Sequence, residues 1–315
     1  MYTARRTYGT RYSSLSQNDL LCLFGTKSWD ALSFEERRDA CQEVENRYAQ
    51  ANGCQPCKVE TAEITGSCYG YQSGGTLTLN ESLLRDGVFM TEDFDDEGNG
   101  VLATTEVPAP NWNMLDTVYH EGTHGIQVAQ GRMPFSYFDP VRDYDLYRIQ
   151  PIEKEAFEAG QNYTLQAIDI VQEEMGEVDP SAIDYYCTVQ QQSYQQSFDS
   201  AADHYQDPDI DKTVESAIQW HDMGMRPQNP TPSMEAIYGM LDGPEEQLQQ
   251  SSFDDGSTLS QQSLSEQELD DGASLSFGGA IATSGVDDGA DISSADISSL
   301  DSPAECQNVD DGYSF

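Results

Sequence analysis

The sequence has little positive charge for its size. Its 315 residues include 15 Lys and Arg against 56 Asp and Glu, which gives a formal net charge of −41. A chain this acidic is repelled by phosphate backbones and by anionic lipid headgroups. Nucleic acids and membrane surfaces are therefore not expected among its partners.

Long hydrophobic runs are also missing. No stretch approaches the ~18 consecutive apolar residues that a transmembrane helix needs. The N-terminal residues carry positive charge, but no apolar segment of an export signal follows them. The sequence thus predicts a cytoplasmic protein, with non-classical export as an effector as the alternative.

The cysteines do not form a recognisable framework. Their number, seven, is odd, and the single Cys-x-x-C pair, Cys54 and Cys57, lacks the second pair of a structural zinc site. Free thiols are therefore expected in place of disulfides.

Composition changes along the chain, and no Lys or Arg follows Arg226. The remainder is rich in Ser, Gln, Gly and Asp, and it cannot bury enough apolar surface to offset the entropy cost of ordering. The sequence therefore predicts four segments: an N-terminal arm at 1–29, a folded domain at 30–226, a linker at 227–242, and a disordered acidic tail at 243–315.

Within the folded segment, hydrophobic periodicity and turn signals predict an α+β fold, in which an N-terminal helix and a small mixed β-sheet precede further helices. Ser33 and Glu36 form a capping box that starts a helix over Phe34–Ala51, which Gly53 ends. The expected strands are Lys58–Ile64, Thr76–Asn80 and Val101–Val107, and the expected later helices are Asn113–Gly131, Pro151–Met175, Ser181–Tyr205 and Ile210–Trp220.

The helix expected at Asn113–Gly131 carries the chemistry, because residues 120–124 read His-Glu-Gly-Thr-His. Histidines four residues apart lie on one face of a helix, so His120 and His124 can bind one metal ion. Glu121 then lies toward the open coordination position, an arrangement typical of metal-assisted hydrolysis. A single histidine on such a helix is ordinarily structural, but this pair with its glutamate favours a metal site.

A third ligand is needed, because catalytic zinc has three protein ligands and a water. A longer form of the motif needs His or Asp where this chain has Gln130, so a glutamate from a later helix is expected. Glu153 shares a face with Ala156 and Gly160, whose small size allows close approach to the metal helix. The sequence favours Glu153 as the ligand, with Glu155 as the alternative and an ordinary solvated acidic turn as the remaining explanation.

The sequence resembles the zincin metallopeptidases. Among these it resembles the gluzincins, in which His-Glu-x-x-His is followed by a helix with Glu-x-x-Ala. The resemblance covers about residues 30–180 and extends to small bacterial and phage-associated zincins. Phe157 stands where some families have an aspartate that supports the site. The resemblance rests on His120, Glu121, His124, Gln127, Glu153 and Ala156.

The resemblance implies a zincin-like fold for the folded domain and a zinc-dependent peptidase that acts on a peptide or protein. Zinc would be held by His120, His124 and Glu153, and Glu121 would act as the general base. The alternative is an inactive binding module with the same fold, in which the zinc site is structural and the acidic tail mediates interaction. The sequence does not predict the oligomeric state.

Two further elements are expected to serve the substrate. Tyr144 or Tyr147, in the loop before the glutamate helix, would donate a hydrogen bond to the carbonyl oxygen. The strand Val101–Val107 would form the sheet edge along which an extended peptide lies.

Overall fold

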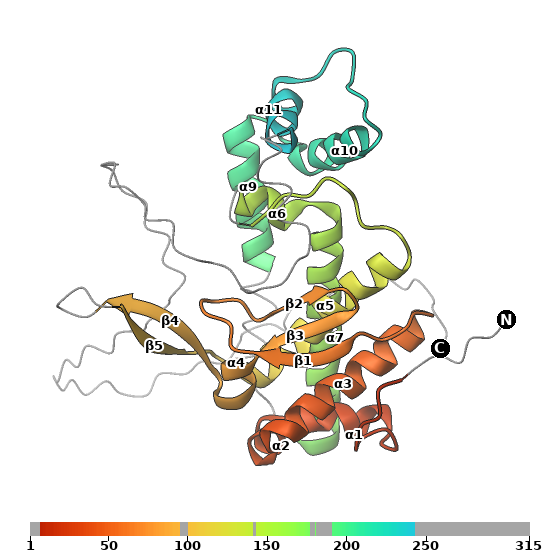
Figure 1. Ribbon diagram of the computed structural model, residues 1–315, viewed down its shortest axis with the longest axis vertical. Helices are drawn as coiled ribbons and strands as arrows, with labels where there is room; N and C mark the ends of the chain where they lie inside the picture. The colour runs from red at the N-terminus through yellow and green to blue at the C-terminus, as the bar shows by residue number, and fades with distance from the viewer. Residues whose placement is uncertain (1–6, 95–99, 141–142, 177–179, 181–190, 243–315) are drawn as a thin grey trace, which may run out of the picture. The chain divides into compact units, whose positions relative to one another are not determined.

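The computed structural model describes residues 7–94, 100–140, 143–176, 180 and 191–242 (Figure 1). The tail expected at 243–315 and the start of the helix expected at Ser181–Tyr205 lie outside these residues. The elements in chain order are α1 (Gln17–Leu21), η1 (Cys22–Phe24), α2 (Thr26–Ala31), α3 (Phe34–Ala51), β1 (Lys58–Ala62), β2 (Gly70–Ser73), β3 (Thr76–Asn80), α4 (Glu81–Asp86), β4 (Val88–Phe94), β5 (Gly100–Glu106), α5 (Pro110–Ala129), α6 (Tyr144–Ile149), α7 (Pro151–Met175), α9 (Gln191–Tyr205), α10 (Ile210–Asp222) and α11 (Pro232–Leu241).

The α+β class is confirmed. Helix α3 has the predicted bounds, and its capping box is formed: the Ser33 hydroxyl accepts from the Glu36 N–H at 3.3 Å, and the Glu36 carboxylate accepts from the Ser33 N–H at 2.9 Å. The cap satisfies main-chain donors that have no partner within the helix, so the helix starts at this point.

The small mixed sheet has the order β1-β3-β2, in which β1 pairs parallel and β2 antiparallel to β3. Leu77 and Leu79 of the central strand are fully buried, and β2 and β3 both contact α5 (Figure 1). The sheet therefore supports the helix that carries the histidine motif, and β2 is the edge strand beside it.

The strand expected at Val101–Val107 has a different place. It forms β5, which pairs antiparallel with β4 in a separate two-stranded sheet, with Val88 opposite Glu106 (Figure 1). Strand β5 is thus an edge of this two-stranded sheet and not of the three-stranded sheet that contacts α5. Strand β4, whose pairing decides where β5 lies, was not predicted from the sequence.

Helix α5 begins earlier than predicted. Pro110 occupies its first turn, and the preceding Ala109 has a positive φ of 49°. Asn113 is therefore not the N-cap; its side chain donates to the Pro108 carbonyl at 2.6 Å. The end is as expected, because Gly131 adopts the left-handed conformation (φ 67°) that ends helices.

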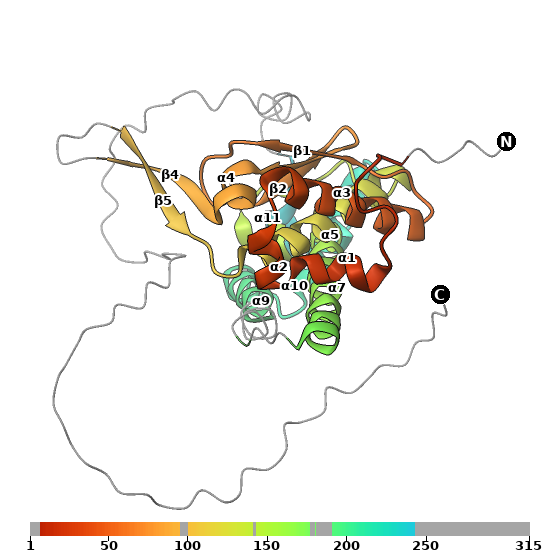
Figure 2. The same ribbon diagram turned by 90° about the horizontal axis from the view of Figure 1, so that it is seen from below.

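Helices α5 and α7 pack closely (Figures 1 and 2). A Cβ atom at Gly160 of α7 would lie 1.9 Å from Oδ1 of Asp116 in α5. On another face of α5, a Cβ atom at Gly122 would lie 2.5 Å from Oε2 of Glu45 in α3. No side chain fits at either glycine, and this explains why a central helix carries residues that weaken it.

The described chain contains two hydrophobic clusters. The first joins the N-terminal helices, the sheet, α5 and α7, with Trp29, Trp112 and Leu79 among its most buried members. The second joins α6, α9, α10 and α11, with Leu146 and Ile237 fully buried. None of the described helices is long and apolar enough to cross a membrane.

Helix α11 lies within the range 227–242, where the sequence predicts a linker. The Thr231 hydroxyl caps it by accepting from the Met234 N–H at 3.2 Å, and Pro232 follows at the first position. Ile237 and Leu241 are buried in the second cluster. The Thr-Pro start of this stretch is an ordinary helix signal.

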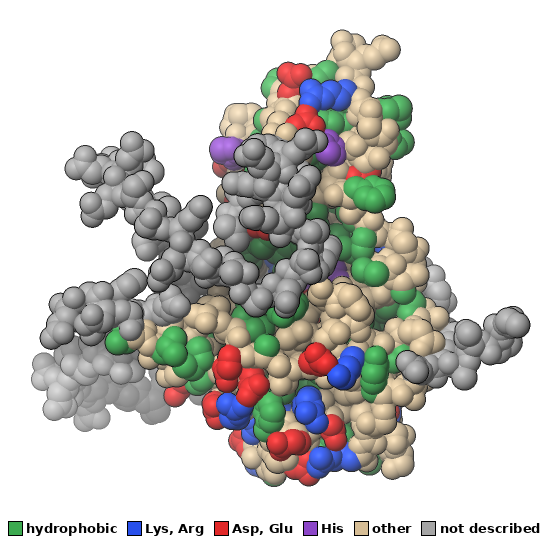
Figure 3. All heavy atoms as spheres, in the orientation of Figure 1, with side chains coloured by type: hydrophobic (Ala, Val, Ile, Leu, Met, Phe, Trp, Pro, Cys, Tyr) green, Lys and Arg blue, Asp and Glu red, His purple; other side chains and the backbone are tan. Residues whose placement is uncertain are grey.

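Charged side chains of both signs gather over α3 and α4 on the face in Figure 3. The ion pairs there include Arg11 with Asp39 at 2.9 Å, and Arg85 with Glu81. Both arginines are more than 40% exposed, so such pairs contribute little to stability.

Candidate metal site

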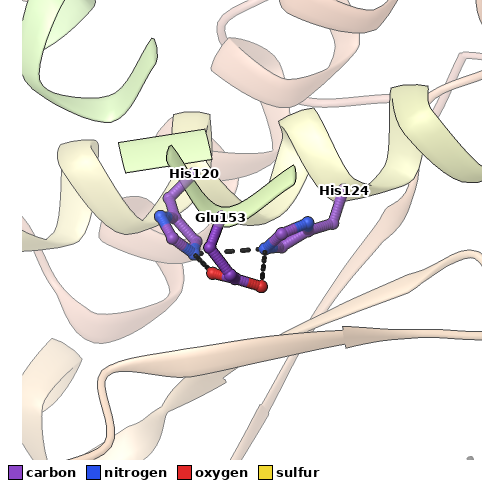
Figure 4. Close-up of side chains that lie close together, drawn as sticks. All are labelled: His120, His124 and Glu153. Carbon is purple, nitrogen blue, oxygen red and sulfur yellow. Dashed lines mark hydrogen bonds and ion pairs between the residues drawn. The ribbon is translucent and has the colours of Figure 1, made fainter. Parts of the chain in front are cut away.

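The structure brings together three side chains that the sequence proposes as metal ligands. His120 and His124 face one another one turn apart on α5, and Glu153 reaches them from the first turn of α7 (Figure 4). The Nε2 atoms lie 3.2 Å apart, and Glu153 lies 3.2 Å from His124 and 3.5 Å from His120. All three donor atoms lie within 4.8 Å of one another, so they could hold one metal ion.

The placement of Glu153 follows from the packing of α7 on α5. Ala156 and Gly160 lie on the same face, and both are buried against the metal helix. Glu153 itself is 1% exposed. Its position in the first helical turn is favourable for a carboxylate, because the N-terminal end of a helix carries partial positive charge.

Gln127 fixes the tautomer of His124. The Gln127 side-chain amide donates from Nε2 to the Ile152 carbonyl at 3.0 Å and to Glu155 at 3.1 Å, so its oxygen must face His124. That oxygen accepts from Nδ1 of His124 at 2.8 Å. In the neutral imidazole the Nδ1 atom therefore carries the proton, and the lone pair of Nε2 faces the cluster, as a metal ligand requires.

One carboxylate oxygen of Glu153 has no hydrogen-bond donor. Its Oε1 accepts a hydrogen bond from the Tyr137 hydroxyl at 2.7 Å, whereas Oε2 is buried with no hydrogen-bond partner. A buried carboxylate oxygen without a donor is costly. A metal ion between this oxygen and the imidazole nitrogens would remove that cost, so the residues present fit a metal.

The electrostatics of the cluster also favour bound positive charge. Burial by itself raises the pKa of Glu153, but the imidazoles of His120 and His124 outweigh it and hold the pKa below its usual value. Burial alone would lower the pKa of His124, but Glu153 and Glu121 raise it to about 9. The site thus attracts a proton or another cation into the space between these groups.

Glu121 lies beside the three side chains. It is 9% exposed, and its Oε1 is 3.9 Å from Nε2 of His120. Burial raises the pKa of Glu121, the two imidazoles lower it, and the charge of Glu153 raises it again, so that the net shift is upward. A carboxylate with a raised pKa is suited to accept and return a proton.

Glu155, the alternative third ligand, lies outside the cluster. Its carboxylate accepts two hydrogen bonds from the Arg132 guanidinium, at 2.7 and 2.9 Å, and its side chain is 45% exposed. These contacts, led by the bond from Arg132, lower its pKa. Glu155 therefore belongs to a surface ion pair, and it touches the site only through Gln127.

The tyrosine that donates a hydrogen bond to Glu153, at 2.7 Å, is Tyr137, which was not predicted from the sequence. It lies in the loop between α5 and α6, and only its position between the two ligand helices could have indicated it. Burial and Glu153 raise the pKa of Tyr147, one of the two expected tyrosines, whose ring lies 6.1 Å from that of Tyr137. Tyr144, the other, is 44% exposed and contacts the ring of Tyr147 at 6.0 Å.

Phe157 stands where some zincins have a supporting aspartate. Its ring packs against the His120 ring, with centroids 4.4 Å apart and planes at 62°. The Arg148 guanidinium lies over its ring, 3.2 Å from the centroid. An aromatic contact therefore restricts His120 at the place of the carboxylate.

Comparisons with known proteins give no relatives: no family model, curated protein or solved structure matches this chain. The resemblance to zincins therefore depends on the motif residues. What the structure adds is a possible metal site made of His120, His124 and Glu153 on two adjacent helices.

Proposed function

We propose that the protein is a zinc-dependent metallopeptidase of gluzincin type, with His120, His124 and Glu153 as zinc ligands and Glu121 as the general base. The observation that carries the proposal is a buried cluster of two imidazole nitrogens and a carboxylate within 4.8 Å, one carboxylate oxygen of which has no hydrogen-bond donor. Two nitrogens and one oxygen are a ligand set of catalytic zinc, which leaves the fourth position for water.

When bound, zinc supplies a coordinated water of pKa about 7 and polarises a substrate carbonyl. The chain supplies orientation and proton transfer. Gln127 keeps the Nε2 lone pair of His124 directed into the site. Glu121 takes the proton from the attacking water and gives it to the amine nitrogen that leaves.

Strand β2 is the element that we propose to hold the substrate backbone. The main-chain N–H of Gln72 in β2 interacts with the Glu121 carboxylate, so this strand lies next to the base. Strand β2 lies at one edge of the three-stranded sheet, where it pairs with β3 alone among the described strands. An extended peptide can add to such a free edge through main-chain hydrogen bonds, and this proposal replaces the one for Val101–Val107.

The test combines metal analysis with a base substitution. We expect about one zinc per purified chain and hydrolysis of a peptide library. Glu121→Gln should retain zinc and lose at least about 100-fold in turnover, because general-base catalysis contributes 10²–10⁴-fold. Glu155→Gln is the matched control, since it neutralises a nearby glutamate that lies outside the cluster. This variant should retain both its zinc and its turnover.

Three outcomes separate the alternatives. Unchanged turnover in Glu121→Gln would assign proton transfer to another residue. Stoichiometric zinc with no hydrolysis of any library peptide would favour an inactive module that uses the zinc for binding or stability. A chain without zinc affinity would contradict the ligand assignment itself.

A further inference from the structure

The loop that carries Tyr137 is held from a helix that contributes no ligand. This loop, 131–140, leaves the end of α5 and leads toward α6. Asp222, the last residue of α10, accepts from the N–H of Phe135 at 3.1 Å and from the N–H of Ser136 at 2.8 Å. It also accepts from the Ser136 hydroxyl. One carboxylate thus holds three donors of two successive loop residues.

The position of Asp222 is unfavourable for its own helix. A carboxylate in the last turn is repelled by the partial negative charge of the helix C-terminus. Its contacts with the loop are charge-assisted hydrogen bonds, which are about twice as strong as neutral ones. The hydrogen bonds to the loop therefore explain why an aspartate occupies position 222, since the helix itself does not favour one.

The other side of Tyr137 is held as well. Gln150 is fully buried, and its amide accepts from the Phe138 N–H at 3.2 Å and donates to the Phe138 carbonyl at 3.0 Å. The Phe138 side chain is buried in the second hydrophobic cluster. Tyr137 therefore lies between two fixed residues, and its hydroxyl reaches Oε1 of Glu153 at 2.7 Å.

Ser136 also contacts His221, whose Nδ1 lies 2.6 Å from the serine oxygen and whose Nε2 lies 3.1 Å from Oδ1 of Asp242. A serine, a histidine and an aspartate in a row are also found in hydrolases. Here the serine is 6% exposed and donates its proton to Asp222. The row therefore adds a further anchor for the loop and is not a second nucleophilic site.

We propose that Asp222 is a positioning residue for the metal site. By holding the loop at Phe135 and Ser136, it keeps the Tyr137 hydroxyl on Oε1 of Glu153. This contact fixes the carboxylate with Oε1 3.2 Å from Nε2 of His124 and Oε2 3.5 Å from Nε2 of His120. The inference depends on the metal site of the proposed function. It gives the C-terminal helices a role in that site, although they carry none of its ligands.

The experiment uses the full chain with Co²⁺ as the probe, because the d–d absorption of Co²⁺ reports ligand geometry. Tyr137→Phe should change this spectrum and weaken Co²⁺ binding about tenfold, the lower end of the range for partners of a metal ligand. Asp222→Ala should produce the same change, and adding it to Tyr137→Phe should have no further effect. The matched control is Glu215→Gln on the exposed face of α10, which should leave the spectrum unchanged.

Amide hydrogen exchange gives a second measurement that does not depend on metal. The N–H groups of Phe135 and Ser136 should exchange slowly in the wild-type chain and quickly in Asp222→Ala. Asp222→Asn keeps one acceptor oxygen and should restore part of the protection and part of the spectrum. If Asp222→Ala does not fold, Ser136→Ala removes a single donor and should give the same changes at smaller size.

The outcomes distinguish this inference from the proposed function. Failure of the wild-type chain to bind Co²⁺ would overturn the metal site, while exchange at Phe135 and Ser136 would still decide whether Asp222 fixes the loop. Binding of Co²⁺ with an unchanged spectrum in Asp222→Ala would overturn the inference alone. The inference would also be overturned if the losses of Co²⁺ affinity caused by Asp222→Ala and Tyr137→Phe were additive in the double variant.

Discussion

The two hydrophobic clusters of the described chain differ in how they relate to the candidate site. The first cluster includes α5 and α7, which supply His120, His124 and Glu153 directly. The second, built from α6 and α9–α11, supplies none of these donors, but its helices hold the loop of Tyr137 through Asp222. The candidate donors and the hydrogen bonds to the neighbouring tyrosine loop thus come from different parts of the fold.

The difference also extends to packing around glycines. In the part of the fold built around the first cluster, called the first region below, a Cβ atom at Gly122 or at Gly160 would overlap a neighbouring side chain. The second region is the part built around the second cluster. In the second, Gly239 of α11 has no atom within 4 Å of its Cβ position. The two glycines in the helices that carry the candidate donors are thus tightly packed, and the glycine of α11 is not.

The largest expected effect is a loss of zinc binding, and it tests whether the donor atoms come from the first region alone. His120→Ala removes a donor atom, so zinc binding should fall by more than the about 10–100-fold that loss of an outer partner costs. His204→Ala changes an exposed histidine of α9, whose ring contacts Tyr205, and should leave zinc content unchanged. Metal analysis and a chelator competition measure both; equal loss in the two variants would contradict the assignment.

The second prediction concerns Glu45, the buried acid behind α5. Burial raises its pKa from the usual 4.5 to about 7, despite a hydrogen bond from the Cys57 N–H. The other carboxylate oxygen, Oε2, is buried without a partner. The folded chain keeps this proton over a pH range in which the unfolded chain loses it. The contribution of Glu45 to the free energy of unfolding should therefore fall by about 3 kcal/mol as pH rises from about 4.5 to 7 and above.

Glu45→Gln tests this prediction, because the amide oxygen can still accept from Cys57 and carries no charge. The variant should gain stability relative to wild type as the pH rises, and denaturant unfolding at pH 5 and pH 8 measures the difference. Glu235→Gln, at an exposed position of α11, is the control and should show no such trend. A difference between wild type and Glu45→Gln that does not vary with pH would refute the assignment.

Much of the first region could be predicted from the sequence, because its signals are local. The capping box of Ser33 and Glu36 and the proline at 151 gave the starts of α3 and α7. The cluster of His120, His124 and Glu153 was also favoured by the sequence. The evidence was the spacing of residues along two helices and the small residues that share a face with Glu153. Periodicity along a helix is sufficient to place side chains on one face.

The elements that were missed depend on partners far away in the sequence. Strand Val101–Val107 was recognised, but its position is set by β4, a strand with no clear turn or periodicity signal. Tyr137 contacts Glu153 from a loop that is bonded to Asp222, which lies 86 residues from Ser136. Such contacts require the three-dimensional arrangement of α10, which spacing within a single segment does not reveal.

The smallest effects compare the glycines of the two regions directly. Gly160→Ala would place a Cβ atom 1.9 Å from Oδ1 of Asp116, and the required shift of α5 against α7 should cost about 2 kcal/mol of unfolding free energy. Gly239→Ala meets no atom within 4 Å and should stabilise the chain by ~0.5–1 kcal/mol, because alanine favours the helix. Denaturant unfolding of both variants measures the pair. Changes of opposite sign in unfolding free energy would establish that α5 and α7 are tightly packed at Gly160, whereas α11 is not at Gly239. Stabilisation by Gly160→Ala would mean that α5 and α7 are free to move apart. In that case this contact does not hold Glu153 in place.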